Sequence, residues 1–267
     1  KTRVAVPSFL SGAKVLSAKP AGPRDLMLDL QAGGHERWSE MPNAFRDARE
    51  LGGTAIVAGW YHPYCRVLAT DLDACSWYPT ANSGGRVEEG ILASLGWSLR
   101  SANPFLVYRD RHARAYEALL RDARVAVSHR GAGLTFVHLS AAHFPVIYDR
   151  HAGRLTLFHS SRRGHEDMLA LADRTFALLR TQMEIEGTWD PSTVIVTADH
   201  PAGIANRAEG IKDSRVPFLL KLPHETAGRL WDRPVSATRL GRPLIRAVLA
   251  GEVATEEQAI AWLERNA

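Results

Sequence analysis

The stretch EDMLALADRTFALLRTQMEIEGTWDPSTVIVTADH, residues 166–200, decides the fold class of this chain. Its first part predicts a long helix, because apolar side chains recur every three or four positions on one helical face. These side chains are Met168, Ala172, Phe176, Leu179 and Met183. Gly187 ends the helix, and the apolar run TVIVT at residues 193–197 predicts a strand. A helix that leads into a strand followed by polar residues is typical of the crossover unit of a parallel sheet.

The same alternation of helix and strand patterns continues on both sides of this stretch. Further strands are predicted at residues 25–30, 54–58, 134–139 and 216–222. Further helices are predicted at residues 41–51, 109–128, 240–249 and 256–265. This alternation predicts an α/β fold with three layers, α/β/α, around a mostly parallel central sheet. No internal repeat or long linker interrupts the pattern, so we expect one domain over residues 1–267.

The composition excludes several classes of protein. The chain has 267 residues, 45% apolar and 23% charged, with a formal net charge of +4. These values are typical of a globular protein and exclude collagen-like, mucin-like and low-complexity disordered chains. No apolar run reaches the roughly 18 residues of a membrane span. The basic residues are scattered among acidic ones without an aromatic-basic platform, so we expect no nucleic-acid partner.

Two cysteines, Cys65 and Cys75, lie ten residues apart. No Cys-x-x-Cys pattern accompanies them, which argues against a zinc knuckle. They form either one short disulfide loop in an oxidising compartment or two separate buried thiols. We favour the disulfide, and two separate buried thiols stay open as the alternative.

Polar residues follow three of the predicted strands, at the ends where active groups of open α/β sheets gather. His62 comes shortly after residues 54–58, His143 after residues 134–139, and Asp199-His200 directly after residues 193–197. A carboxylate and an imidazole suit a divalent metal ion. The alternative is that each histidine is a satisfied structural residue and that Asp199 caps the next turn. The histidines assigned to surface or structural positions are His35, His112, His129, His151, His159, His165 and His224.

Five quoted stretches resemble the sulfatase-like branch of the alkaline phosphatase superfamily. In the C-terminal half these are TFVHLSAAHFP (135–145), ALADRTFALLRTQMEIEGTWDPSTVIVTADHP (170–201) and SRVPFLLKLP (214–223). Their order and spacing match the family pattern. Upstream, FRDARELGGTAIVAGWYHPYC (45–65) resembles the segment that ends in Lys-Trp-His, and TRVAVPSFLSG (2–12) resembles the nucleophile segment.

The resemblance implies a role for each matching position. Thr2 falls on the metal-bound nucleophile, and Asp199 and His200 fall on the metal-binding pair. His143 falls on the histidine that contacts the transferred group or protonates the leaving group, and His62 on one that helps hold the anionic group. The implied cofactor is a divalent metal ion (zinc, manganese, calcium or magnesium). The implied substrate is a small anionic ester, with a lipid or glycan head group as one form of it.

Several positions depart from the family pattern. Neither Cys65 nor Cys75 lies in the Cys/Ser-x-Pro-x-Arg motif of true sulfatases, so Thr2 favours the phosphoryl-transferring side of the family. Ala5 replaces a serine, Trp60 a lysine and Pro201 a glycine. The family's first acidic metal ligand precedes the nucleophile. We therefore expect this catalytic domain to be incomplete at its N-terminus, without that first strand and its ligand.

Together these observations predict metal-dependent hydrolysis or transfer of a phosphate (or sulfate) ester group through a covalent threonine intermediate. One alternative is a sulfuric ester hydrolase. Another is a non-catalytic sulfatase-like relative that acts as a binding domain, which Ala5, Trp60 and Pro201 favour. The cysteine pair and the resemblance imply an extracytoplasmic location, periplasmic or at the cell surface. Any membrane attachment would come through a segment upstream of the chain.

Overall fold

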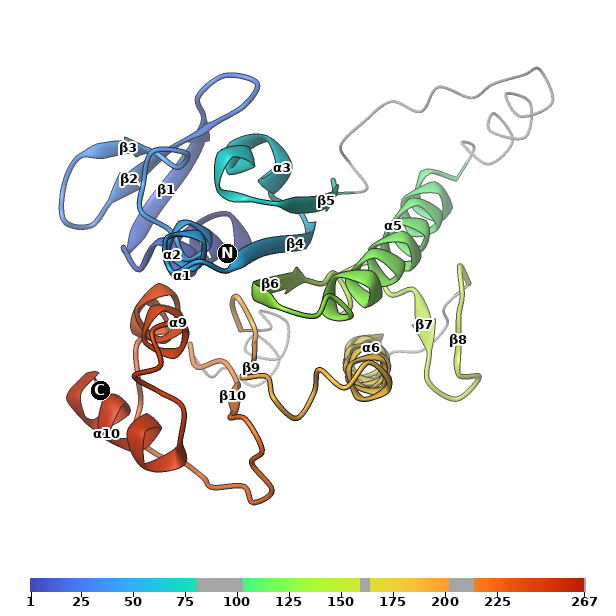
Figure 1. Cartoon of the computed structure of the whole chain (residues 1–267). Helices are drawn as coiled ribbons and strands as arrows, with labels where there is room; N and C mark the ends of the chain where they lie inside the picture. Colours follow the sequence, from blue (N-terminus) through green and yellow to red (C-terminus); the bar gives the residue numbers. More distant parts are fainter. Residues whose placement is uncertain (81–102, 159–163, 202–213, 267) are drawn as a thin grey trace.

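The computed structural model describes residues 1–80, 103–158, 164–201 and 214–266. Its central sheet has three parallel strands, with β4 (Thr54–Trp60) between β5 (Ala74–Tyr78) and β6 (Ala132–His138). In Figure 1 these strands lie at the centre, with helices on either side. β4 is buried along nearly its whole length, as expected for a parallel strand that is covered on both faces.

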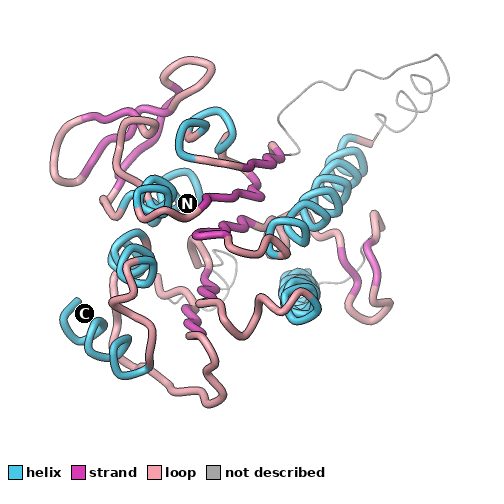
Figure 2. The backbone as a smooth tube through the Cα atoms, viewed as in Figure 1, coloured by secondary structure: helices cyan, strands magenta, loops and turns pink. Residues whose placement is uncertain are grey.

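Successive side chains of β4 point to opposite faces of the sheet, and this alternation builds the three layers. Ala55 and Val57 pack in a core with three helices, α1 (Thr2–Ser11), α2 (Ala44–Glu50) and α9 (Arg242–Leu249). Ile56 and Ala58 pack in a second core with two long helices, α5 (Pro104–Val127) and α6 (Gly164–Ile185). Figures 1 and 2 show these two groups of helices on opposite sides of β4. The predicted three-layer α/β/α fold is confirmed.

The remaining elements surround this sandwich. An antiparallel sheet consists of β1 (Val15–Pro20), β2 (Leu26–Leu30) and β3 (His35–Arg37). Two antiparallel pairs are β7 (Tyr148–Asp149) with β8 (Arg154–Leu155), and β9 (Val194–Thr197) with β10 (Phe218–Lys221). The remaining helices are α3 (Tyr64–Val67), the 3-10 helix η1 (Ala69–Asp71), α8 (Ala237–Leu240) and α10 (Glu256–Asn266). No helix within the described ranges is long and apolar enough to cross a membrane.

The strand predicted at residues 193–197 forms, but its pairing differs from the predicted parallel crossover. β9 pairs antiparallel with β10, and no ladder joins it to the central sheet within the part of the chain that the structure describes. Lys221 on β10 adds side-chain contacts to this antiparallel pair. Its ammonium group donates to the carbonyl oxygens of Trp189, Asp190 and Ser192, at 2.6, 2.9 and 3.0 Å. These bonds hold β10 against the turn that leads into β9.

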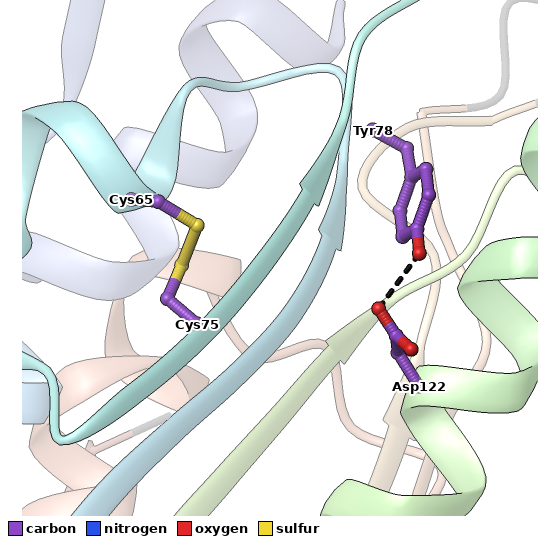
Figure 3. Close-up of a disulfide and its surroundings, with 4 residues drawn as sticks. All are labelled: Cys65, Cys75, Tyr78 and Asp122. Carbon is purple, nitrogen blue, oxygen red and sulfur yellow. Dashed lines mark hydrogen bonds between the residues drawn. A yellow bond between two sulfur atoms is a disulfide. The ribbon is translucent and has the colours of Figure 1, made fainter.

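The two cysteines form a disulfide between α3 and β5, which settles the alternatives left by the sequence. The Cys65–Cys75 bond joins Cα atoms 5.5 Å apart (Figure 3). Farther along β5, the Tyr78 hydroxyl donates to Asp122 of α5 at 2.7 Å, and Figure 3 shows this bond beside the disulfide. β5 is thus fixed to α3 on one side and to α5 on the other.

Candidate functional site

The carboxyl end of β4 carries the first predicted site residue, His62. The chain leaves the strand at Trp60 and turns through Tyr61, whose φ of 73° lies in the left-handed region that non-glycine residues rarely adopt. The turn places His62 in the interior, with 1% of its surface exposed. There its Nε2–H donates to the backbone carbonyl of Thr2 at 3.0 Å. The structure therefore brings His62 and Thr2 together.

Thr2 is the first residue of α1 and is buried, with 7% of its surface exposed. The bond from His62 holds this helix start against the sheet edge, where the N-terminus mark lies close to β4 in Figure 1. Burial lowers the pKa of His62 to about 4, and the bond to Thr2 opposes that shift only in part. At neutral pH His62 is therefore an uncharged donor that orients Thr2. It does not supply a positive charge for an anion.

Next to His62, Tyr64 and His138 form a hydrogen-bonded pair. The Tyr64 hydroxyl lies 2.7 Å from His138 Nδ1, across from α3 to the end of β6. Burial raises the pKa of Tyr64 well above its usual value and lowers the pKa of His138. Both groups are thus neutral at pH 7, and the hydroxyl donates to the imidazole. A Cβ on Gly59 would lie 2.4 Å from the Tyr64 ring, so the pair depends on glycine at that position.

His138 is not among the residues that the sequence predicts for the site. It is the last residue of β6 and lies inside the apolar run LTFVHL, whereas the predicted site residues follow their strands. A histidine that closes an apolar strand run was the available signal. Asp199 raises the pKa of His138, and the neighbouring imidazoles of His143 and His200 lower it. His138 is thus within electrostatic reach of three of the predicted site residues.

Asp199 and His200 follow β9, as predicted, with Asp199 Oδ2 and His200 Nε2 3.8 Å apart. His200 Nδ1 lies 3.0 Å from the carbonyl oxygen of Pro201. Asp199 Oδ2 is buried and has no hydrogen-bond partner among the described residues. A buried carboxylate oxygen is unfavourable unless a cation or a donor meets it.

His143 lies beyond the end of β6, exposed to solvent. Its ring packs against Trp60, with ring centroids 4.8 Å apart. Its Nδ1 lies 2.5 Å from the carbonyl oxygen of Phe144. Because a carbonyl only accepts, Nδ1 carries the hydrogen and Nε2 is the nitrogen left for proton exchange.

The predicted residues, together with Tyr64 and His138, therefore meet at one edge of the fold in two parts. Thr2, His62, Tyr64 and His138 lie at the ends of β4 and β6, whereas Asp199 and His200 approach from β9. Within the described ranges, no three or more His, Cys, Asp and Glu side chains are grouped to hold a metal ion. His159, assigned above to surface or structure, lies outside the described residues.

Two solved structures of a known protein have a fold similar to that of this chain. No protein-family model matches the chain, and no curated protein matches it significantly. The structure of Ps i-CgsB in complex with k-i-k-neocarrahexaose matches at 17% identity with a TM-score of 0.57, covering 96% of this chain and 63% of that one. A second structure of Ps i-CgsB matches at 17% identity with a TM-score of 0.51, covering 83% of this chain and 56% of that one.

At 17% identity these matches show the fold alone, which the chain shares with the two Ps i-CgsB structures. The chain spans less than two thirds of the length of either structure that it matches.

Proposed function

We propose that this chain cleaves or transfers phosphate or sulfate ester groups, with Thr2 as the nucleophile. The observation that carries the proposal is the 3.0 Å hydrogen bond from His62 to the Thr2 carbonyl. It holds a buried threonine at the sheet edge that Asp199 and His143 also approach. The sulfatase-like fold supports an enzyme of ester chemistry.

The start of α1 suits the proposed nucleophile. Thr2 lies at the positive end of a ten-residue helix, where a developing alkoxide or an ester anion is stabilised. A threonine hydroxyl is a weak nucleophile at its ordinary pKa, so it needs a cation close to its oxygen.

Asp199, His200 and the Thr2 hydroxyl are the groups that would hold this cation. The buried, unpartnered Oδ2 of Asp199 fits it, because a positive ion satisfies a carboxylate oxygen that finds no donor in the described residues. The cation, zinc, manganese, calcium or magnesium, would supply charge neutralisation at the Thr2 oxygen and at the non-bridging ester oxygens. The imidazole ligand suits zinc, whereas the carboxylate suits magnesium, calcium and manganese.

The chain's own residues then carry out the separate steps of the proposed reaction. The Thr2 oxygen forms a bond to phosphorus or sulfur while the bond to the leaving oxygen breaks and its electron pair stays on that oxygen. The Thr2 proton passes to water, and His143, when both of its ring nitrogens carry a proton, gives the Nε2 proton to the leaving oxygen. Water then attacks the group on Thr2 and releases inorganic phosphate or sulfate. An alcohol in place of water makes the same chain a transferase.

A glycan ester is the substrate class to examine first, with lipid head groups as the second. The support for the glycan is that the matching structure of Ps i-CgsB holds k-i-k-neocarrahexaose. The Cys65–Cys75 disulfide supports an extracytoplasmic location, because disulfides persist in oxidising compartments.

The test compares Thr2→Ala and Thr2→Ser with the parent chain on aryl phosphates, aryl sulfates and glycan esters. Each assay contains one of the four metal ions. We expect turnover with at least one metal, a loss of about 1,000-fold or more in Thr2→Ala, and partial activity in Thr2→Ser. Thr70→Ala, an exposed substitution, serves as the control. Undiminished turnover in Thr2→Ala would refute the nucleophile.

A non-catalytic binding domain is the second candidate, and one observation favours it. Trp60 stands where the family pattern has a lysine, and its indole packs on His143. Metal analysis separates the two candidates. One bound metal ion per chain supports the enzyme. No bound metal and no turnover on any of the esters support the binding domain.

A further inference from the structure

The indole of Trp60 has no part in the reaction proposed above, although it lies beside the proposed proton donor. Trp60 is the last residue of β4, and its side chain falls on the same face of the sheet as Ile56 and Ala58. There it belongs to the core that includes Leu119 and Ala123 of α5. Only 3% of Trp60 is exposed, so the surrounding core fixes its ring in place.

Three imidazoles surround this indole. The ring centroid of His143 lies 4.8 Å from that of Trp60, with an angle of 57° between the two planes. The centroids of His112 and His138 lie 5.9 and 6.0 Å from it, in edge-to-face contacts. Aromatic rings attract one another at centroid separations of roughly 4.5–7 Å. The indole is therefore the common neighbour of the three imidazoles, and His143 is the nearest of them.

His143 is the exposed member of the three imidazoles. Burial fixes His112, which is 1% exposed, and a 2.7 Å hydrogen bond from the Tyr64 hydroxyl fixes His138. The His143 ring makes one hydrogen bond within the described residues, from Nδ1 to the Phe144 carbonyl. Because Phe144 is the next residue of the same exposed turn, this bond sets the tautomer of the ring but not its direction relative to the sheet edge.

The indole N–H does not explain why a tryptophan stands at this position. Trp60 Nε1 is buried and has no hydrogen-bond partner among the described residues. A buried donor without a partner is unfavourable, so an apolar side chain would suit a position that only fills the core. The size and flatness of the indole remain as the reason, and they suit contact with several imidazole rings at once.

We infer that Trp60 is a positioning residue, which fixes the direction of the His143 imidazole by ring packing. The inference deepens the proposed function and rests on it, because it takes His143 as the proton donor. A proton donor has to be held within hydrogen-bond reach of the leaving oxygen, and a displacement of about 1 Å can slow a reaction about 100-fold. An exposed side chain samples several rotamers unless a neighbouring group limits it.

The first test needs neither a variant nor a substrate. NMR relaxation measures the order parameter of the His143 ring in the parent chain. The ring of exposed His129, which lies outside this group of rings, is the internal comparison. We expect a value near that of rigid backbone, about 0.85, for His143 and a lower value for His129. A value for His143 no higher than that for His129 would overturn the inference.

The second test compares Trp60→Phe, Trp60→Met and Trp60→Leu with the parent chain. Phenylalanine keeps a flat ring, whereas methionine and leucine remove it. We expect Trp60→Met and Trp60→Leu to lower the order parameter of the His143 ring, and to lower kcat about 100-fold with KM nearly unchanged. Trp60→Phe should keep both readouts close to those of the parent.

Trp77→Leu is the matched control. Trp77 is a partly buried tryptophan on the neighbouring strand β5, and the Arg66 guanidinium lies over its ring at 5.1 Å. The control should change neither the order of the His143 ring nor kcat. Equal losses in Trp77→Leu and Trp60→Leu would overturn the inference, because general loosening of the sheet would then explain both. So would an unchanged order parameter and kcat in folded Trp60→Leu or Trp60→Met.

If neither of these two variants folds, the comparison of His143 with His129 in the parent chain decides alone. Failure of the proposed function shows separately. In that case His143→Ala retains full turnover, while the order parameters of the parent and of the Trp60 variants still report whether the indole holds the His143 ring.

Discussion

The two parts of the candidate site differ in how fully their polar groups are paired. At the ends of β4 and β6, His62 is bonded to Thr2 and Tyr64 to His138, and these groups are neutral and mostly buried. At the end of β9, Asp199 has a buried oxygen with no hydrogen-bond partner in the described residues. Pairing of this kind builds a rigid support, whereas an unpaired carboxylate oxygen is the place that receives a ligand.

The largest expected effect comes from a substitution in the β9 part of the site. Asp199→Asn should lower turnover about 1,000-fold, because it removes the charge that would hold the cation. The free energy of unfolding should change little, since the Asp199 side chain is 26% exposed and its Oδ2 has no hydrogen-bond partner to lose among the described residues. Steady-state kinetics and urea denaturation measure the two quantities. Asp190→Asn, at an exposed position nearby, is the control, and an equal loss of turnover in both variants would contradict the assignment.

Acid should weaken the paired part of the site. His62 and His112 have folded pKa values of about 4, below the usual 6.5, so they stay neutral in the fold while the unfolded chain takes up protons. Stability is therefore complete above about pH 6.5 and is lost as the pH falls toward 4. For each histidine we expect the free energy of unfolding to fall by about 2 kcal/mol between pH 7 and pH 5.

Urea denaturation across this pH range measures the slope. His62→Asn keeps a donor near the Thr2 carbonyl and removes one titrating group, so its slope should be smaller than that of the parent. An unchanged slope in His62→Asn and in His112→Asn would show that neither imidazole is held neutral.

The disulfide should stabilise the paired part by a comparable amount. Cys65→Ser with Cys75→Ser opens a loop of ten residues, and we expect the free energy of unfolding to drop by about 3 kcal/mol. Chemical denaturation with and without a reducing agent measures it. The reducing agent should destabilise the parent and leave the double variant unaffected. Equal sensitivity in both would argue against the bond.

The smallest expected effect concerns packing at the end of β4. Gly59→Ala places a Cβ against the Tyr64 ring at 2.4 Å and should destabilise the fold by about 1–3 kcal/mol. Gly228 has open space around its Cα, so Gly228→Ala is the matched control with a change near zero. Thermal unfolding compares the two. Similar midpoints for both variants would show that the Tyr64 ring has room to move.

The sequence predicted the strands that support the site because β4 and β6 are short apolar runs that end in polar residues. It also located Thr2, His62 and Asp199 at the sheet edge. It did not predict that β9 would pair with β10, because this pairing and the bonds of Lys221 to carbonyl groups some thirty residues earlier join segments that lie apart in the chain. Such a contact leaves no periodic signal.

Two histidines show what the sequence pattern could not predict. His138 lies within a strand run, and His112 lies on a helix rich in polar residues, so neither differs in sequence from an ordinary structural histidine. Their importance comes from what the fold places around them. His138 meets the Tyr64 hydroxyl, and the His112 ring packs edge to face on Trp60. Only the three-dimensional arrangement brings these groups together.

The most direct test of the central claim is mass spectrometry of the chain after rapid acid quenching during turnover of an aryl phosphate or sulfate. The account predicts one phosphoryl or sulfuryl group on the peptide that contains Thr2, absent from Thr2→Ala and from chain without substrate. Turnover that proceeds with no modification of Thr2, and at the same rate in Thr2→Ala, would contradict it.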